Sequence, residues 1–109
     1  MTKYFEEIND GNMDIKFLHE LDKAREIAGV PFVINSAFRT PEHNAKIGGS
    51  PNSSHMRGLA VDISVTDSRQ RFIILNALIQ VGFNRIGIAK TFIHVDMDEN
   101  KSGEVVWLY

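Results

Sequence analysis

Two segments of the sequence contain side chains that can bind a metal ion. Residues 54–62 contain His55 and Asp62, and residues 92–96 contain His94. Neutral imidazole nitrogens and carboxylate oxygens bind zinc at about 2.0–2.2 Å, and a catalytic zinc keeps one further position for water. Because the chain contains no cysteine, a closed structural site built from thiolates is excluded. A zinc ion held by these three residues would therefore be open for chemistry.

The spacing of these residues indicates how the chain would bring them together. His55 precedes Asp62 by seven residues, too far for one face of a helix, so a loop entering a strand is expected to join them. Residues 92–96 alternate, and a period of two places His94 and Asp96 on one face of a strand, with the aliphatic residues toward the core. A single histidine in a strand is usually a packed or surface residue, so neither histidine alone identifies a site.

Hydrophobic periodicity predicts two helices that must carry much of the core. Apolar residues at helical spacing predict one helix over residues 14–28, ended by Gly29. A second helix is expected to begin after a cap at Thr66 or Asp67 and to end near residue 81. Its apolar stripe is expected to contain Phe72, Leu75, Leu78 and Ile79.

Short runs of β-forming residues predict the sheet. Strands are expected at residues 31–37, 59–65, 85–89, 92–97 and 104–108. Residues 40–54 are rich in small polar residues, glycine and proline, and are expected to form a surface segment with one helical turn after Pro41. The predicted fold class is α+β, with helices packed on one side of a small, mostly antiparallel sheet.

Length and charge limit the classes of function. A chain of 109 residues is expected to form one domain over residues 1–109. The net charge of −2 leaves no basic surface for a nucleic acid. No apolar run approaches the ~20 residues that cross a bilayer, and the N-terminal residues lack the apolar region of a secretory signal. We expect a monomer that is made in the cytoplasm and does not insert into membranes.

Four short motifs, in order, resemble those of the M15 metallopeptidases of bacterial cell walls and phage endolysins, in the D-alanyl-D-alanine peptidase superfamily. They are S-A-F-R-T at residues 36–40, N-A-K-I-G-G at 44–49, S-S-H-M-R-G-L-A-V-D at 53–62 and H-V-D at 94–96. The resemblance covers most of the chain, from about residue 33 to residue 107. It implies a hedgehog/DD-peptidase-like fold and a zinc-dependent peptidase activity.

The resemblance also implies roles for particular residues. One zinc ion per chain would be held by His55, Asp62 and His94, and would lower the pKa of its water toward about 7. Arg39 would orient the substrate carbonyl or carboxylate and stabilise the oxyanion, because a guanidinium is always charged and presents a planar fork of donors. The implied substrate is a peptidoglycan stem peptide or cross-link, and these ligands do not determine which bond is cut.

The sequence departs from the family pattern at the general base. Many members carry Glu or Asp three residues before the last histidine, where this chain has Thr91. The nearest carboxylate on the expected ligand face is Asp96, which is expected to be the catalytic base that takes the proton of the zinc-bound water. The alternative is that Asp96 orients the water or a ligand imidazole. Asp98 is a weaker candidate and is expected to lie in a solvated turn.

Ser54 and His43 are further candidates for contact with substrate. Ser54 is expected to form hydrogen bonds from the loop near the metal. His43 lies in the loop after Arg39, where a surface position is favoured over one that lines the cleft. Two other functions stay open: a non-catalytic zinc-containing binding module, as in hedgehog domains, and a metal-free assembly domain of a virion. If the chain is a phage lysis enzyme, it would act on the cell wall after release through a partner's pore.

Overall fold

The computed structural model describes residues 2–109, which contain three α-helices, two 3-10 helices and five strands. The helices are α1 (Ile15–Ala28), α2 (Pro41–Lys46) and α3 (Ser68–Val81), with the 3-10 helices η1 (Glu6–Ile8) and η2 (Ser54–Arg57). The strands are β1 (Val33–Ser36), β2 (Ala60–Ser64), β3 (Arg85–Ile88), β4 (Phe92–Asp96) and β5 (Val105–Leu108). Every predicted helix and strand is present, with ends within a few residues of those expected.

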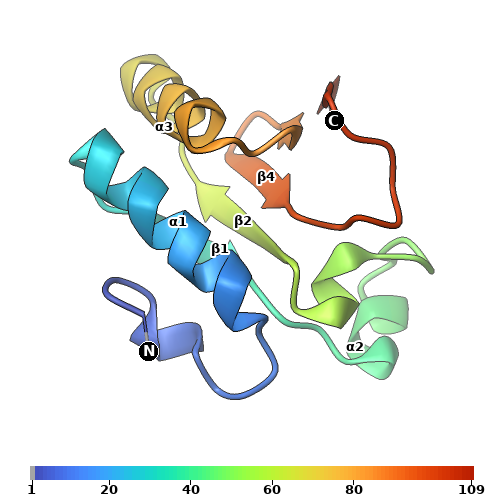
Figure 1. The fold of residues 1–109 in the computed structure, drawn as a ribbon. Helices are drawn as coiled ribbons and strands as arrows, with labels where there is room; N and C mark the ends of the chain where they lie inside the picture. The colour runs from blue at the N-terminus through green and yellow to red at the C-terminus, as the bar shows by residue number, and fades with distance from the viewer. Residues whose placement is uncertain (1) are drawn as a thin grey trace.

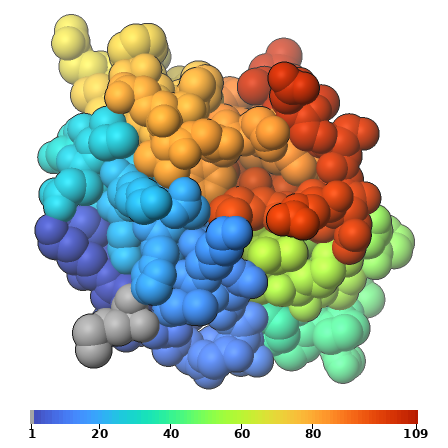
Figure 2. Space-filling model, viewed as in Figure 1, coloured from blue at the N-terminus to red at the C-terminus, as the bar shows by residue number. Residues whose placement is uncertain are grey.

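The five strands form one mixed sheet in the order β1-β2-β4-β3-β5. The pairs β1–β2, β2–β4 and β4–β3 are antiparallel, and the edge strand β5 runs parallel to β3. Helices α1 and α3 pack side by side against one face of this sheet (Figure 1) and form a continuous surface over it in the space-filling view (Figure 2). The fold class is therefore α+β, and the opposite face of the sheet is left for polar residues.

Local capping sets the ends of both long helices. The Asp14 carboxylate accepts a hydrogen bond from the Phe17 N–H at 2.8 Å, and the Asp67 carboxylate accepts one from the Gln70 N–H at 2.9 Å. Each bond satisfies a backbone donor that the first helical turn leaves free. Asp67, rather than Thr66, is thus the cap of α3. No helix within residues 2–109 is long and apolar enough to cross a membrane.

The buried face of α3 differs from the predicted stripe. Ile74 and Leu78 are buried, but Phe72 is 68% exposed and Ile79 is 53% exposed. With 3.6 residues per turn, these two side chains lie about 160° and 140° around the helix from Ile74, so the contact with α1 and the sheet does not reach them. The prediction that Phe72 and Ile79 belong to the buried stripe was wrong, because the predicted apolar stripe is wider than the face that α3 buries.

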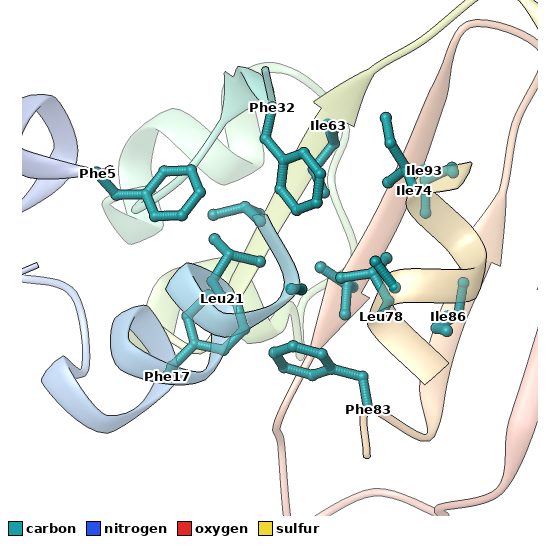
Figure 3. Packing of buried hydrophobic residues seen from close by; sticks show 14 of the residues in the cluster. Phe5, Phe17, Leu21, Phe32, Ile63, Ile74, Leu78, Phe83, Ile86 and Ile93 are labelled. Carbon is teal, nitrogen blue, oxygen red and sulfur yellow. The ribbon is translucent and has the colours of Figure 1, made fainter. Parts of the chain in front are cut away.

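The core lies between the two helices and the sheet, and it fixes the strands that carry the candidate site. Ile63 on β2 and Ile93 on β4 point toward the helices, among residues such as Leu21 and Phe17 (Figure 3). Because side chains alternate across a strand, the neighbours of these isoleucines point to the opposite face of the sheet. The expected orientation of β4, aliphatic residues inward, is confirmed.

Gly58 joins the loop after η2 to the start of α1. Its backbone lies in the left-handed region at φ +68°, and an added Cβ would be 2.1 Å from the carbonyl oxygen of Asn12. The Gly58 carbonyl accepts a hydrogen bond from the Asp14 N–H at 2.9 Å. This close approach explains the glycine three residues after His55 in the sequence motif.

We predict that Gly58→Ala destabilises the fold more than Gly29→Ala. Both glycines have φ +68°, but a Cβ at Gly29 meets no atom within 4 Å. Gly29→Ala should therefore lower the free energy of unfolding only by the cost of a left-handed backbone at a residue with a side chain, about 1–2 kcal/mol. Gly58→Ala should lower the free energy of unfolding by about 1–3 kcal/mol more than Gly29→Ala, because its Cβ clashes with Asn12. Urea unfolding of both variants measures the difference, and equal losses would contradict the role of this contact.

Candidate metal centre

Three buried side chains from three elements meet on the polar face of the sheet. His55 comes from η2, Asp62 from β2 and His94 from β4, and Asp62 and His94 are direct partners in the β2–β4 register. One ligand atom from each lies within 4.8 Å of the others. The residues that the sequence singled out as a ligand set are thus brought together around one point.

The distances between these atoms suit a small divalent ion. The Oδ1 atom of Asp62 lies 3.3 Å from His55 Nε2 and 3.1 Å from His94 Nδ1. Ligands at about 2.0–2.2 Å from a tetrahedral zinc are about 3.3–3.6 Å apart. The two imidazole nitrogens and the carboxylate oxygen therefore need only small shifts to bind the same ion.

Hydrogen bonds outside this cluster orient both imidazole rings. His55 Nδ1 donates to the carbonyl oxygen of Ala37 at 2.8 Å, which leaves Nε2 free to act as the ligand atom. His94 Nε2 donates to Asp96 Oδ2 at 2.7 Å, which turns Nδ1 toward Asp62. A second partner of this kind fixes the tautomer and the orientation of a metal-binding histidine. Both rings are thus set as metal ligands.

Both carboxylate oxygens of Asp96 are already occupied. Oδ2 accepts from His94, while Oδ1 accepts from Arg85 Nε at 2.7 Å and from the Asp98 N–H at 3.1 Å. Burial opposes the charge of Asp96, but the hydrogen bonds from His94, the Asp98 backbone and Arg85 lower its pKa below the usual range. Asp96 contacts the His94 nitrogen that faces away from Asp62, so it lies behind the ligand ring.

The electrostatics of the cluster favour a negative carboxylate beside a cation. Burial alone would raise the pKa of Asp62, but hydrogen bonds from His55 and His94 lower it to about 2. Burial likewise opposes the charged form of His94, and the hydrogen bonds of Asp62 and Asp96 outweigh it, so the pKa of His94 is raised above its usual value of 6.5. Asp62 is therefore ionised at neutral pH and available to a metal ion.

Arg39 is the cationic group beside the cluster. Its guanidinium NH2 nitrogen lies 3.6 Å from Asp62 Oδ2, and its NH1 nitrogen donates to Asn44 Oδ1 at 3.1 Å. The Asn44 amide in turn donates to the Ser50 carbonyl at 2.7 Å. Asn44, which is buried, thus ties Arg39 to the loop after α2.

The second glycine of the pair after α2 allows this arrangement. A Cβ at Gly49 would lie 2.1 Å from Asn44 Oδ1 and 3.2 Å from Arg39 NH1. The Gly49 N–H also donates to the Asn44 carbonyl at 2.8 Å. Only a residue without a side chain lets the loop close over Asn44 here. The N-A-K-I-G-G motif therefore serves to place the guanidinium of Arg39.

A cleft of about 320 Å³ opens above the cluster. It is lined by Arg39, residues 47–50, His55, Asp62, Phe92, His94 and Tyr109. This volume lies at the small end of the range of about 300–1,000 Å³ for ligand sites. The candidate metal ligands form part of a surface that a small group can reach.

Ser54 and His43 do not line this cleft among the residues described. The Ser54 hydroxyl is buried, donates to Asp98 Oδ2 at 2.7 Å and accepts from Lys101 Nζ at 2.9 Å. His43 is exposed on α2. Neither side chain is placed to contact a group bound at the three ligands.

Asp98 is buried, which corrects the expectation of a solvated turn. It is 2% exposed, and it accepts from Ser54 and forms an ion pair with Arg57. These bonds hold the turn after β4 against η2, the segment that carries His55. The sequence pattern missed this role because the partners lie more than 40 residues away in the chain.

Sequence reasoning also assigned no role to Asn44, Arg85 or Tyr109. Asn44 opens the N-A-K-I-G-G motif, so its place four residues before two glycines was the available signal. Arg85 opens a predicted strand, and nothing in its spacing indicates a bond to Asp96. Tyr109 reaches the cleft only because β5 pairs with β3, which no local pattern predicts.

Comparison with known protein families adds a finding to this geometry. The family model described as peptidase M15 matches residues 1–96, which include all three candidate ligands and Arg39. A comparison with curated proteins gives no match. The match covers most of the chain and ends with β4, so β5 lies beyond it. On this evidence the chain belongs to the peptidase M15 family.

Proposed function

We propose that the protein is a zinc-dependent peptidase that hydrolyses peptidoglycan stem peptides or their cross-links. The observation that carries the proposal is the buried cluster of His55, Asp62 and His94, with both imidazoles oriented as ligands, in a chain of a peptidase family. Two histidines and one carboxylate are a common protein ligand set of catalytic zinc. We propose one Zn²⁺ per chain.

The chain's own residues would divide the work around the metal. His55, Asp62 and His94 would hold the ion, which when bound supplies a Lewis acid and a water of lowered pKa. Arg39 stands beside Asp62 on the wall of the cleft, where its fixed charge would orient a substrate carbonyl and stabilise the developing oxyanion. Asn44 and Gly49 keep that guanidinium in place.

Of the two roles considered for Asp96, the contacts support the positioning role. A general base must reach the proton that it removes, directly or through one water. Asp96 is 1% exposed, and its oxygens are bonded to His94, Arg85 and the backbone of Asp98. We propose that it orients His94 and increases the basicity of the ligand nitrogen.

One observation favours a second function, that of a non-catalytic zinc module on the same hedgehog/DD-peptidase-like fold. Among the described residues that line the cleft, Asp62 is the sole carboxylate, and Thr91 is exposed where many relatives have an acid.

A radius of gyration of 12.9 Å, close to the value of about 13 Å for a compact chain of this length, supports a single domain. We keep the proposal that the chain is a monomer acting on the cell wall after release.

Digestion of purified peptidoglycan tests the peptidase against the binding module. The zinc-loaded protein is expected to release peptides or expose new amines, and mass spectrometry of the products identifies the bond that is cut. His55→Ala should lose both bound zinc and activity, since it removes one of three ligands. A protein with one equivalent of zinc that releases nothing would support the binding module, and failure to bind zinc would contradict both.

We predict that Asp96→Asn weakens zinc binding more than it slows chemistry. Loss of a carboxylate behind a ligand histidine costs about 10–100-fold in metal affinity. At saturating zinc, kcat should stay within about tenfold of the wild type, whereas loss of a general base costs about 10²–10⁴-fold. Chelator competition and steady-state kinetics measure the two effects separately. If the variant binds zinc with normal affinity but its kcat is reduced a thousandfold, Asp96 is the general base and not a positioning residue.

We also predict that zinc affinity rises with pH. The pKa of His94 is raised above 6.5, so this ring carries a proton at pH 6 that zinc must displace. Affinity should increase about tenfold per pH unit below the His94 pKa and level off above it. Titrations against a chelator from pH 5.5 to 8 measure how steeply zinc affinity rises with pH. The control His43→Gln should show the same pH dependence as the wild type. A flat profile would exclude His94 as a ligand.

A further inference from the structure

The edge strand β5, outside the part of the chain that the family model matches, places one aromatic ring against His94 and a second on the wall of the cleft. Trp107 lies opposite Gly87 in the β3–β5 register, and its ring centroid is 5.4 Å from that of His94. Tyr109 follows the strand, donates its N–H to the Ile88 carbonyl at 3.0 Å and lines the cleft. The backbone pairing of β5 therefore fixes where both rings stand.

Gly87 leaves the space that these rings occupy. A Cβ there would be 2.5 Å from Trp107 Nε1 and 2.7 Å from Tyr109 Cε2, closer than van der Waals contact allows. Both rings thus lie against the bare backbone of β3, next to the strand that carries His94. Phe92, on β4, packs its ring 5.1 Å from that of Tyr109 and extends the aromatic surface along the cleft.

The order of the strands puts this aromatic surface opposite the cation. Asp62 and His94 lie on β2 and β4, two of the three inner strands. Arg39 follows β1 at one edge of the sheet, and Tyr109 follows β5 at the other. The cleft therefore has a charged wall on one side of the ligands and an aromatic wall on the other.

We propose that Tyr109, supported by Trp107 and Phe92, is a substrate-binding residue whose ring packs against the side chain next to the scissile bond. This inference rests on the proposed peptidase function. A guanidinium that orients the reacting carbonyl from one side leaves the other side of the cleft for the rest of the peptide, where apolar contact provides affinity. The aromatic wall would thus set which peptides bind productively.

The ring, rather than the hydroxyl, is the group assigned to this role. The ring is held between Phe92 and Trp107, whose ring centroids are 5.1 Å and 6.4 Å away. A ring fixed in this way loses little conformational entropy when a substrate packs against it.

Three variants test the proposal, with a soluble stem pentapeptide (L-Ala-γ-D-Glu-L-Lys-D-Ala-D-Ala) as substrate for the zinc-loaded protein. Tyr109→Ala should raise KM about tenfold and leave kcat within about threefold, because it removes ground-state and transition-state contact alike. Tyr109→Phe should keep KM within about threefold of the wild type. Leu108→Ala is the matched control, since Leu108 is 81% exposed and alternates to the opposite face of β5 from Trp107.

Metal content and fluorescence keep the outcomes distinct. All three variants should bind one equivalent of zinc, which shows that the ligand cluster is intact. Trp107 is the single tryptophan of the chain, so its emission reports peptide binding beside His94 directly. If the wild type binds the pentapeptide without cleaving it and also releases nothing from purified peptidoglycan, the peptidase proposal fails, and the wall is judged by the dissociation constants of the same variants.

Two results would overturn the aromatic wall. In the first, Tyr109→Ala matches the wild type in both KM and the dissociation constant, so the ring makes no contact with the peptide. In the second, Tyr109→Phe loses as much as Tyr109→Ala, so the hydroxyl is the recognising group. Absence of both binding and cleavage in the zinc-loaded wild type would remove this proposal together with the peptidase.

Discussion

The structure depends on the antiparallel pairing of β2 with β4. This pairing sets Asp62 directly opposite His94 on one face of the sheet, while Ile63 and Ile93 face each other on the other. A shift of one residue would exchange the two faces and place charged groups in the hydrophobic core. The burial of the isoleucines under α1 and α3 therefore fixes the register of the ligands as well. Core packing and site geometry are consequences of the same strand pair.

Local patterns in the sequence were sufficient for what depends on neighbours in the chain. The cap at Asp67, one of the two residues expected there, the two long helices and the inward face of β4 all follow from spacing and residue type. These features need no knowledge of which segments meet. The set of candidate ligands, in contrast, followed from the resemblance to the M15 motifs, because neither His55 nor His94 alone identifies a site.

Contacts between distant segments were beyond that reasoning. Asp98 was expected in solvent because its neighbours are polar, yet it is buried against Ser54 from another part of the chain. Gly87 is an ordinary strand residue in the sequence, and its missing side chain matters only because β5 returns beside β3. The buried face of α3 was predicted too wide for a related reason. The width of the buried stripe depends on the elements that pack against the helix, and these cannot be identified from the helix sequence alone.

Three aspartates are buried on or next to β2 and β4, and their contacts separate a candidate ligand from two structural groups. Asp96 and Asp98 each accept hydrogen bonds at 2.7 Å and pair with Arg85 and Arg57. Asp62 has only longer contacts of 3.1–3.6 Å, to the two histidines and Arg39. A buried carboxylate needs close compensation for its lost hydration, and two of the three receive it from protein donors. The third, Asp62, lacks donors this close, as is expected of a carboxylate whose charge a bound cation would compensate.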